Sequence, residues 1–190
     1  MQWRRGLRHL MVWAAILLMG VSASAAEFSA DMTIQSATGG DLTGRVFVRG
    51  NDLRQELDTP VGVQTTIINQ GKDVMYVLLP GQNMYMEMGN SQVTLDGTED
   101  FESKFADKGK VTGLGTETIE GYLCDKYKIV YEDASLGEVT VWVARELNYP
   151  LKVYMDNPKD EATILYRNIE IAELEDSLFV LPPGYQKFSM

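Results

Sequence analysis

The chain has 190 residues, 45% of them hydrophobic and 23% charged, a composition typical of a folded globular protein rather than of a disordered or collagen-like chain. The net charge is −10, and because residues 1–26 hold three arginines and no acidic residue, the rest of the chain carries −13. A surface this acidic repels phosphate backbones and anionic lipid head groups, so nucleic-acid binding is excluded. The single histidine is His9, which leaves residues 27–190 without the imidazole that Ser-His-Asp catalysis and most zinc sites need.

The first 26 residues have the pattern of a secretory signal peptide. Three arginines precede an apolar run, Leu10–Val21, and small residues follow it up to Ala26. The run is shorter than the roughly 20 apolar residues that cross a bilayer, and the small residues form an A-x-A-like cleavage pattern. We therefore predict a signal peptide over 1–26, cleaved after Ala25 or Ala26, and a bacterial periplasmic protein without a stable membrane anchor. An uncleaved N-terminal anchor is the alternative.

From Glu27 onward, short runs of alternating apolar residues are separated by Gly, Pro and Asn, which is the pattern of half-buried strands joined by tight turns. In chain order, these runs are Met32–Ile34, Val46–Val48, Leu53–Leu57, Val61–Ile67, Val74–Leu79, Met84–Met88, Tyr127–Tyr131, Val139–Val143, Leu151–Met155 and Leu165–Ile171. The run Val74–Leu79 is apolar at every position, which predicts that both of its faces are covered.

Helical patterns are few. Phe101 and Phe105 lie four residues apart among charged residues in Glu99–Lys108, and a short helical turn is predicted at Leu174–Phe179. Right-handed twist curls a sheet of this many strands. The sequence therefore predicts a mainly β protein, a single curved antiparallel sheet (a half-barrel of about ten strands) with one or two short helices on its concave side.

Several stretches carry a resemblance to a known family. The most distinctive are a Gly-x-x-Cys-x-Lys-Tyr segment and a Leu-Pro-Pro-Gly-Tyr tail. The full set of matching stretches is Gly44–Glu56, Gly71–Met86, Glu117–Lys128, Val141-Trp142, Tyr149–Lys152 and Phe179–Tyr185. These stretches resemble the periplasmic outer-membrane lipoprotein carrier and sorting superfamily (LolA/LolB-like) and, within it, the DUF4412-type branch of bacterial exported proteins.

The resemblance implies that residues 27–190 form a LolA-like half-barrel domain with a helical lid and an apolar interior that accepts acyl chains. Residues 27–190 contain no histidine and one cysteine and so offer no assembled acid, base and nucleophile, from which we expect a non-enzymatic role with no cofactor. The carriers have Arg-Pro at the turn that corresponds to Arg49-Gly50, whereas this chain has no proline there and a more polar strand after it. The carriers' specific lipoprotein cargo and their hand-off to a receptor are therefore not carried over.

The candidate ligand site is the apolar concave face. Alternation fixes which residues share a face but not which face is concave, so a closed core packed against the Phe101–Phe105 helix is the alternative. Arg54 is the candidate polar group at the mouth, where a cation would hold a lipid phosphate, and a solvated pair with Glu56 is its alternative. The predicted apolar lining is Val46, Val48, Leu57, Ile67, Met84, Met86, Phe101, Phe105, Val141, Val143, Val153 and Leu165.

Two sulfur-containing features have alternative interpretations. Met84, Met86 and Met88 point the same way on a strand, where they suit an adaptable apolar lining or plain core, and less readily Cu(I), since no histidine is available after residue 26. We predict no metal site. Cys124 has lysines in phase on its strand, which would make the thiol reactive, whereas an isolated cysteine is more often a small buried apolar residue.

These observations predict an exported periplasmic binding protein, not an enzyme, that shields the acyl chain of a lipid or lipoprotein in an apolar half-barrel cavity. The alternative is an envelope interaction or sensor protein that has a closed core and binds another envelope protein.

Overall fold

The computed structural model describes residues 27–69, 72, 74–79, 81–89, 105, 108–158 and 160–188. The predicted signal peptide and Phe101 lie outside the described residues, as does most of the predicted helix Glu99–Lys108, of which Phe105 and Lys108 are described.

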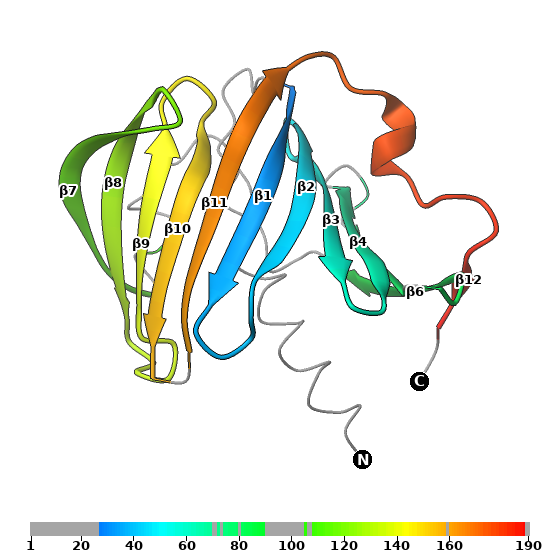
Figure 1. The fold of residues 1–190 in the computed structure, drawn as a ribbon, viewed down its shortest axis with the longest axis horizontal. Helices are drawn as coiled ribbons and strands as arrows, with labels where there is room; N and C mark the ends of the chain where they lie inside the picture. Colours follow the sequence, from blue (N-terminus) through cyan, green and yellow to red (C-terminus); the bar gives the residue numbers. More distant parts are fainter. Residues whose placement is uncertain are drawn as a thin grey trace.

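Twelve strands of the described chain form one open, curved sheet (Figure 1). The mainly β, curved-sheet prediction is therefore confirmed, with two more strands than expected. The strands are β1 (Phe28–Ser36), β2 (Leu42–Arg49), β3 (Asp52–Thr59), β4 (Gly62–Asn69), β5 (Val74–Leu79), β6 (Met84–Gly89), β7 (Gly109–Ile119), β8 (Tyr122–Tyr131), β9 (Glu138–Ala144), β10 (Tyr149–Asn157), β11 (Asp160–Ile171) and β12 (Gln186–Lys187).

The sheet is a meander that turns back on itself once. Its order is β12-β6-β5-β4-β3-β2-β1-β11-β10-β9-β8-β7, so β11 returns to pair with β1 at the centre. The pairs are antiparallel except the parallel pair β12 and β6. The two strands beyond the predicted ten are the edge strand β7 and the two-residue β12. Most residues of β7 are exposed, and an exposed edge strand has no buried face that would impose apolar alternation on its sequence.

One face of the sheet carries the hydrophobic core. Along β1, Phe28, Ala30, Met32 and Ile34 are each at most 1% exposed, while the residues between them face the other way. Their partners on β2 and β11 continue the same apolar layer, which extends to Leu57 on β3 and Ile68 on β4 in one direction and to Ile129 on β8 in the other. We call this face the inner face and the opposite one the outer face.

The C-terminal segment, residues 172–188, crosses part of the outer face (Figure 1). It contains a short 3-10 helix, η2 (Asp176–Phe179), close to the predicted helical turn, although on the outer rather than the concave side. Outer-face side chains bind its backbone: Arg54 donates to the carbonyl of Leu178 at 3.2 Å, and Asn69 donates to that of Phe179 at 3.3 Å. The segment then pairs with β6 as β12, at the edge of the sheet.

Phe179 fixes this segment to the sheet. Its side chain is fully buried, and the guanidinium of Arg49 lies over its ring at 4.5 Å. Ile67 is also fully buried, and its register opposite Arg54 places it on the outer face, where η2 contacts β4. A second, smaller apolar layer therefore lies on the outer face beneath the C-terminal segment.

We predict that Phe179→Ala lowers the free energy of unfolding by about 3–5 kcal/mol, because it removes a fully buried aromatic ring and leaves a cavity. Urea unfolding of the full chain measures this loss. The matched control is Val180→Ala, next in the chain and 41% exposed, for which a change below about 1 kcal/mol is expected. Equal losses in the two variants would show that Phe179 does not fix the segment.

Candidate functional site

The core cluster of the inner face contains half of the predicted lining residues. Val46, Val48, Leu57, Val141, Val143 and Val153 all belong to the core cluster and are at most 8% exposed. These residues share one face because, in β2, β9 and β10, apolar side chains occupy alternate positions and the intervening ones are mostly polar.

Ile67 and Leu165 lie on the outer face instead. Ile67 is opposite Arg54 and Tyr76, and its neighbour Ile68 faces the core. Leu165 is opposite Thr33 and Lys152, between two inward-facing residues of β11. In both strands consecutive residues are apolar, so alternation does not show which of them faces the core. The prediction that Ile67 and Leu165 lie on the same face as the other lining residues is therefore wrong.

Arg54 also lies on the outer face. Its guanidinium contacts the Glu56 carboxylate at 2.6 and 2.7 Å and donates to the backbone of Leu178. The side chain is 14% exposed and is occupied in holding the C-terminal segment. Arg54 therefore does not lie at the mouth of the inner face, as predicted. It lies on the opposite face, where it binds the C-terminal segment.

The methionines of β6 extend the inner face toward one end of the sheet. Met86 is opposite Val77 and Met88 is opposite Met75, so both share the face of the core residues, as does Met84 two positions earlier. All three are only half-buried, in contrast to the valines above. Unbranched thioether side chains adapt to irregular apolar shapes, so this end of the inner face is the most accommodating part of it.

Phe105 packs against the core cluster from outside the strands and is half-buried. Among the described residues, Phe105 and Leu147, in the turn before β10, are the apolar side chains outside the strands that reach this cluster. Phe101, the second residue of the predicted lid, lies outside the described residues. A single sheet is stable in water only when its apolar face is covered by another layer, and these two side chains supply a small part of that layer.

Three aromatic rings lie at the centre of the inner face. Tyr149 packs edge to face on Phe28 at 5.3 Å between centroids and on Tyr166 at 5.5 Å. Both tyrosines are at most 2% exposed, and within the described structure neither hydroxyl has a hydrogen-bond partner. Burial raises the pKa of both phenols, so they remain neutral hydrogen-bond donors. Leaving a buried hydroxyl unpaired costs about 1–3 kcal/mol.

Sequence reasoning missed these tyrosines as site residues. Tyr166 alternates with Ile164 and Ala162 on the inner side of β11, so its parity was available in the sequence. The β10–β11 hairpin brings Tyr149 and Tyr166 together, and the long-range pairing of β1 with β11, which no local pattern shows, adds Phe28.

Cys124 is fully buried, within the core cluster. Burial raises the pKa of its thiol, the opposite of what the neighbouring lysines suggested, and the negative charges of Asp125 and Glu117 add to the effect. The interpretation as a small buried apolar residue is therefore the one that the structure supports.

We predict that the Cys124 thiol reacts with a disulfide reagent at pH 8 at least about 100-fold more slowly in the folded chain than in urea, because labelling requires opening of the core. The matched control moves the thiol one residue, as Leu123→Cys in a Cys124→Ala background, since Leu123 is 48% exposed. The control should label at close to the unfolded rate. Rapid labelling of native Cys124 would contradict its burial.

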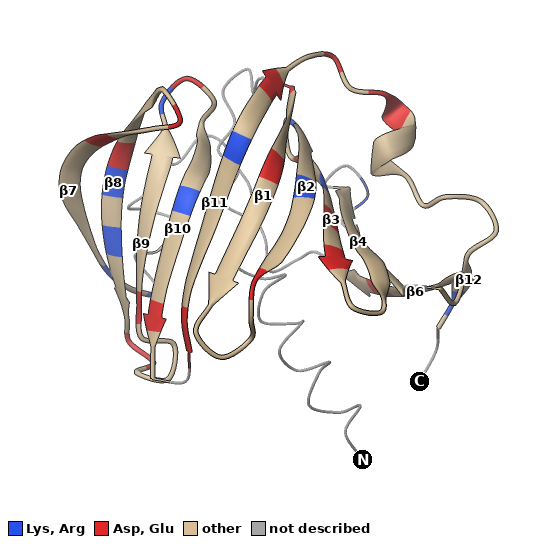
Figure 2. Ribbon diagram, in the orientation of Figure 1, with Lys and Arg blue, Asp and Glu red and all other residues tan. Residues whose placement is uncertain are grey.

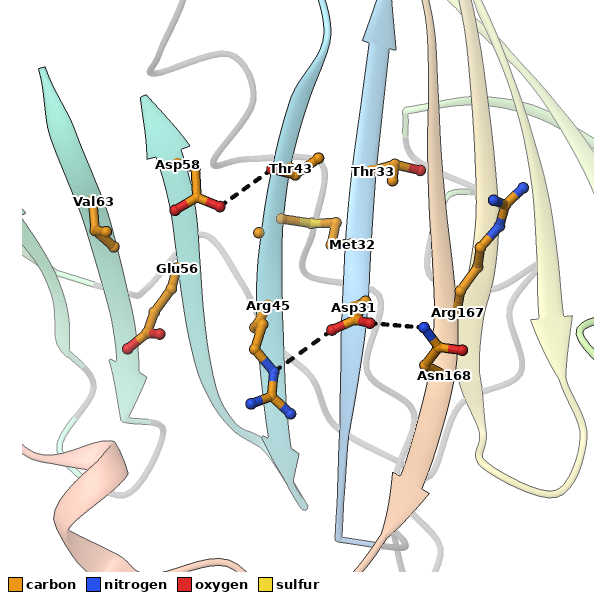
Figure 3. A pocket seen from close by; sticks show the side chains of 11 residues that line it. Asp31, Met32, Thr33, Thr43, Arg45, Glu56, Asp58, Val63, Arg167 and Asn168 are labelled. Atoms are coloured by element: carbon orange, nitrogen blue, oxygen red, sulfur yellow. Dashed lines mark hydrogen bonds and ion pairs between the residues drawn. The ribbon is translucent and has the colours of Figure 1, made fainter. Parts of the chain in front are cut away.

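The outer face carries the charged groups. Figure 2 shows basic and acidic residues on neighbouring strands from β8 across to β3. A shallow hollow of about 530 Å³ lies over β3, β2, β1 and β11, lined by both signs of charge (Figure 3). Within it Arg45 pairs with Asp31 at 3.7 Å, each about half exposed, and Thr43 donates to Asp58 at 3.2 Å. Exposed pairs of this kind contribute little, so the hollow is best described as a solvated polar surface.

Trp142 marks the outer face at the other end of the sheet. The ammonium groups of Lys126 and Lys152 lie over its ring at 4.7 and 4.5 Å, and its indole N–H donates to Glu117 at 2.7 Å. This hydrogen bond, together with that of Lys126, holds the pKa of Glu117 below its ordinary value.

Because the pKa of Glu117 is lowered in the folded chain, its contribution to stability is present above the ordinary carboxyl pKa of about 4.5 and is lost as the pH falls through the lowered value. We predict that Trp142 fluorescence changes with a midpoint below pH 4.5. Trp142→Phe gives the background signal, and Glu117→Gln should abolish the transition. A transition that persists in Glu117→Gln would assign it to another group.

No cluster of three or more potential metal-binding side chains, and no helix long and apolar enough to cross a membrane, is found within the described ranges. No curated protein sequence matches the chain.

Solved structures share this fold at low identity. An uncharacterised conserved protein from Thermus thermophilus matches with a TM-score of 0.60 and 12% identity, over 96% of this chain and 98% of that one. MucB matches with a TM-score of 0.58 and 14% identity, over 93% of this chain and 64% of that one. The complex of MucA and MucB from Pseudomonas aeruginosa matches with a TM-score of 0.57 and 16% identity, over 88% and 59%.

A family model settles the classification. The model described as a domain of unknown function, DUF4412, matches residues 28–149, which run from the start of β1 to the first residue of β10. This match covers more than half of the chain and confirms the resemblance found in the sequence, so the chain belongs to the DUF4412 family.

Proposed function

We propose that this protein is an exported, non-enzymatic binding protein that holds the acyl chain of a lipid or lipoprotein against the inner face of its sheet. The observation that carries the proposal is the methionine-rich end of that face, where Met84, Met86 and Met88 continue the buried core and are themselves half-buried. An export route is supported by the signal-peptide pattern of residues 1–26.

The energetics of such a site are favourable. Removing a methylene group from water contributes about 0.8 kcal/mol, so a chain of about 14 methylenes supplies up to about 11 kcal/mol before the costs of ordering and association. Flexible thioethers can follow a curved or variable acyl chain more closely than branched side chains can. The acidic exterior would at the same time keep the loaded protein off anionic membrane surfaces.

A second candidate is an interaction protein whose inner face is filled by its own side chains. MucB, which shares the fold, has been solved in complex with MucA, so this architecture is compatible with binding a protein partner. In the present chain, β7 is the last strand at one edge of the sheet. Most of its residues are exposed, including Leu114 at 47%. A free edge of this kind can accept an added strand from another protein.

The first experiment is native mass spectrometry of the protein expressed from its complete sequence in a bacterium and purified without detergent. A bound species of lipid mass, recovered by solvent extraction, is the expected result. A ligand-free mass together with no uptake of a fluorescent fatty acid would overturn the acyl-binding proposal in favour of the interaction protein.

Methionine variants then locate the site. We predict that changing Met84, Met86 and Met88 together to Gln weakens binding of a fluorescent fatty acid about tenfold or more, because the site loses apolar contact area. The matched control changes the same three residues to Leu, which preserves the apolar area, and should bind within about twofold of wild type. Equal affinities in the Gln and Leu variants would place the ligand elsewhere. Tight Cu(I) binding that the Leu variant abolishes would instead support the copper alternative.

A further inference from the structure

We infer that Tyr149, Tyr166 and Gln55 form a hydrogen-bonding subsite on the inner face for an uncharged carbonyl oxygen, so that the ligand is a fatty acyl ester or amide rather than a bare hydrocarbon. This inference rests on the proposed function, since it names the chemistry of a ligand on the same face. The oxygenated end of the acyl chain would then lie at the centre of the sheet, and its tail would run toward β5 and β6.

The first observation is the pair of tyrosine hydroxyls. Within the described structure both are buried and have no hydrogen-bond partner. The two phenols lie close enough to influence each other's ionisation, but neither hydroxyl makes a hydrogen bond of normal geometry within the described structure. Phe28 fills the adjacent position on the same face without a hydroxyl, so packing alone does not require the polar atoms. Two neutral donors on rings in contact can both serve one oxygen atom, because a carbonyl oxygen has two lone pairs.

The second observation, on another strand, is Gln55. Its side chain is 3% exposed and faces inward between Leu53 and Leu57 on β3. The hydrogen bond found for its amide is to the sulfur of Met32 at 3.8 Å, and a thioether is a weak acceptor. Met32 is in turn opposite Tyr166 in the β1–β11 register. Hydrogen-bonding groups with weak or missing partners thus lie on β10, β11 and β3 of this face, and the buried Thr66 of β4 lies opposite Gln55.

The residues around this subsite favour an uncharged group on the ligand. The buried polar residues of the described chain are Ser29, Gln55, Thr65 and Thr66, none of them ionisable, and no basic side chain is among the buried residues. A carboxylate held there would be a buried charge without a counter-ion, which is strongly unfavourable. An ester or amide carbonyl accepts the same hydrogen bonds without that penalty. The site is therefore expected to favour a methyl ester over the ionised free acid.

The test compares three probes of equal chain length: methyl palmitate, palmitate and hexadecane. Each is delivered from cyclodextrin and competes with a fluorescent apolar probe for the protein expressed from its complete sequence. Wild type should bind the ester at least about tenfold more tightly than hexadecane. The double variant Tyr149→Phe/Tyr166→Phe should lose about tenfold in affinity for the ester and keep its affinity for hexadecane. Tyr154→Phe, an exposed-hydroxyl control whose phenol bonds to Glu161, should change neither.

Two further readouts separate ligand recognition from a structural role. The double Phe variant should unfold at the same urea concentration as wild type or a higher one, since it removes buried polar atoms that have no partner. With carbonyl-labelled ester, the C=O stretching band should lie at lower frequency in wild type than in the double variant, because hydrogen bonds weaken the carbonyl bond.

The outcomes are distinguishable. Three results would overturn the subsite and leave the acyl-binding proposal intact. The double variant could lose the same affinity for the ester as for hexadecane, it could leave the frequency of the carbonyl band unchanged, or it could be clearly less stable than wild type. The last result would show that the hydroxyls already have partners, such as buried water, in the ligand-free protein. Preference of wild type for ionised palmitate over the ester would also overturn it. Failure of all three probes to bind wild type would overturn both proposals.

Discussion

The structure depends on the two-residue period of side chains along its strands. Because alternate residues face opposite sides, twelve strands in register divide one chain into an apolar inner face and a largely charged outer face. The central pair of β1 and β11 sets this division for both halves of the sheet, since every other strand is paired outward from one of them. A slip of one residue in that pair would place the apolar residues of β1 and those of β11 on opposite faces of the sheet.

One part of the sheet departs from this simple division. In β4 and β5 apolar residues occupy both faces, and the C-terminal segment with Phe179 covers the outer one. Arg49 and Arg54, outward-facing residues that would elsewhere be solvated, here bind the carbonyls of that segment. The C-terminal segment therefore adds a second apolar layer on the outer face, next to the strand β6 whose inward methionines are half-buried.

The alternation of side chains along a strand also explains which residues could be assigned to a face from the sequence alone. Alternation is local, so the strands and inward residues such as Val46 and Val153 were predicted correctly. Ile67 was not, because Ile67 and Ile68 are both apolar, and only the path of a segment more than 100 residues later decides which of them faces the core. Arg54 was misplaced although its alternation with Leu53 and Leu57 along β3 already puts it on the opposite face. The contact of Phe28 with Tyr149 required the pairing of the first and last long strands, which no local pattern encodes.

A few polar side chains point into the apolar inner face, although a closed core would favour apolar residues at these positions. An inner face designed only to close on itself would carry Phe rather than Tyr at 149 and 166 and an aliphatic residue rather than Gln at 55, since each polar atom there must find a partner or incur a cost. Natural sequences tend to break such rules at functional sites. The presence of buried polar side chains on four strands of this face, including Thr66 opposite Gln55, is difficult to explain by packing alone. It follows directly if the layer that completes the fold includes a molecule with its own hydrogen-bond acceptor.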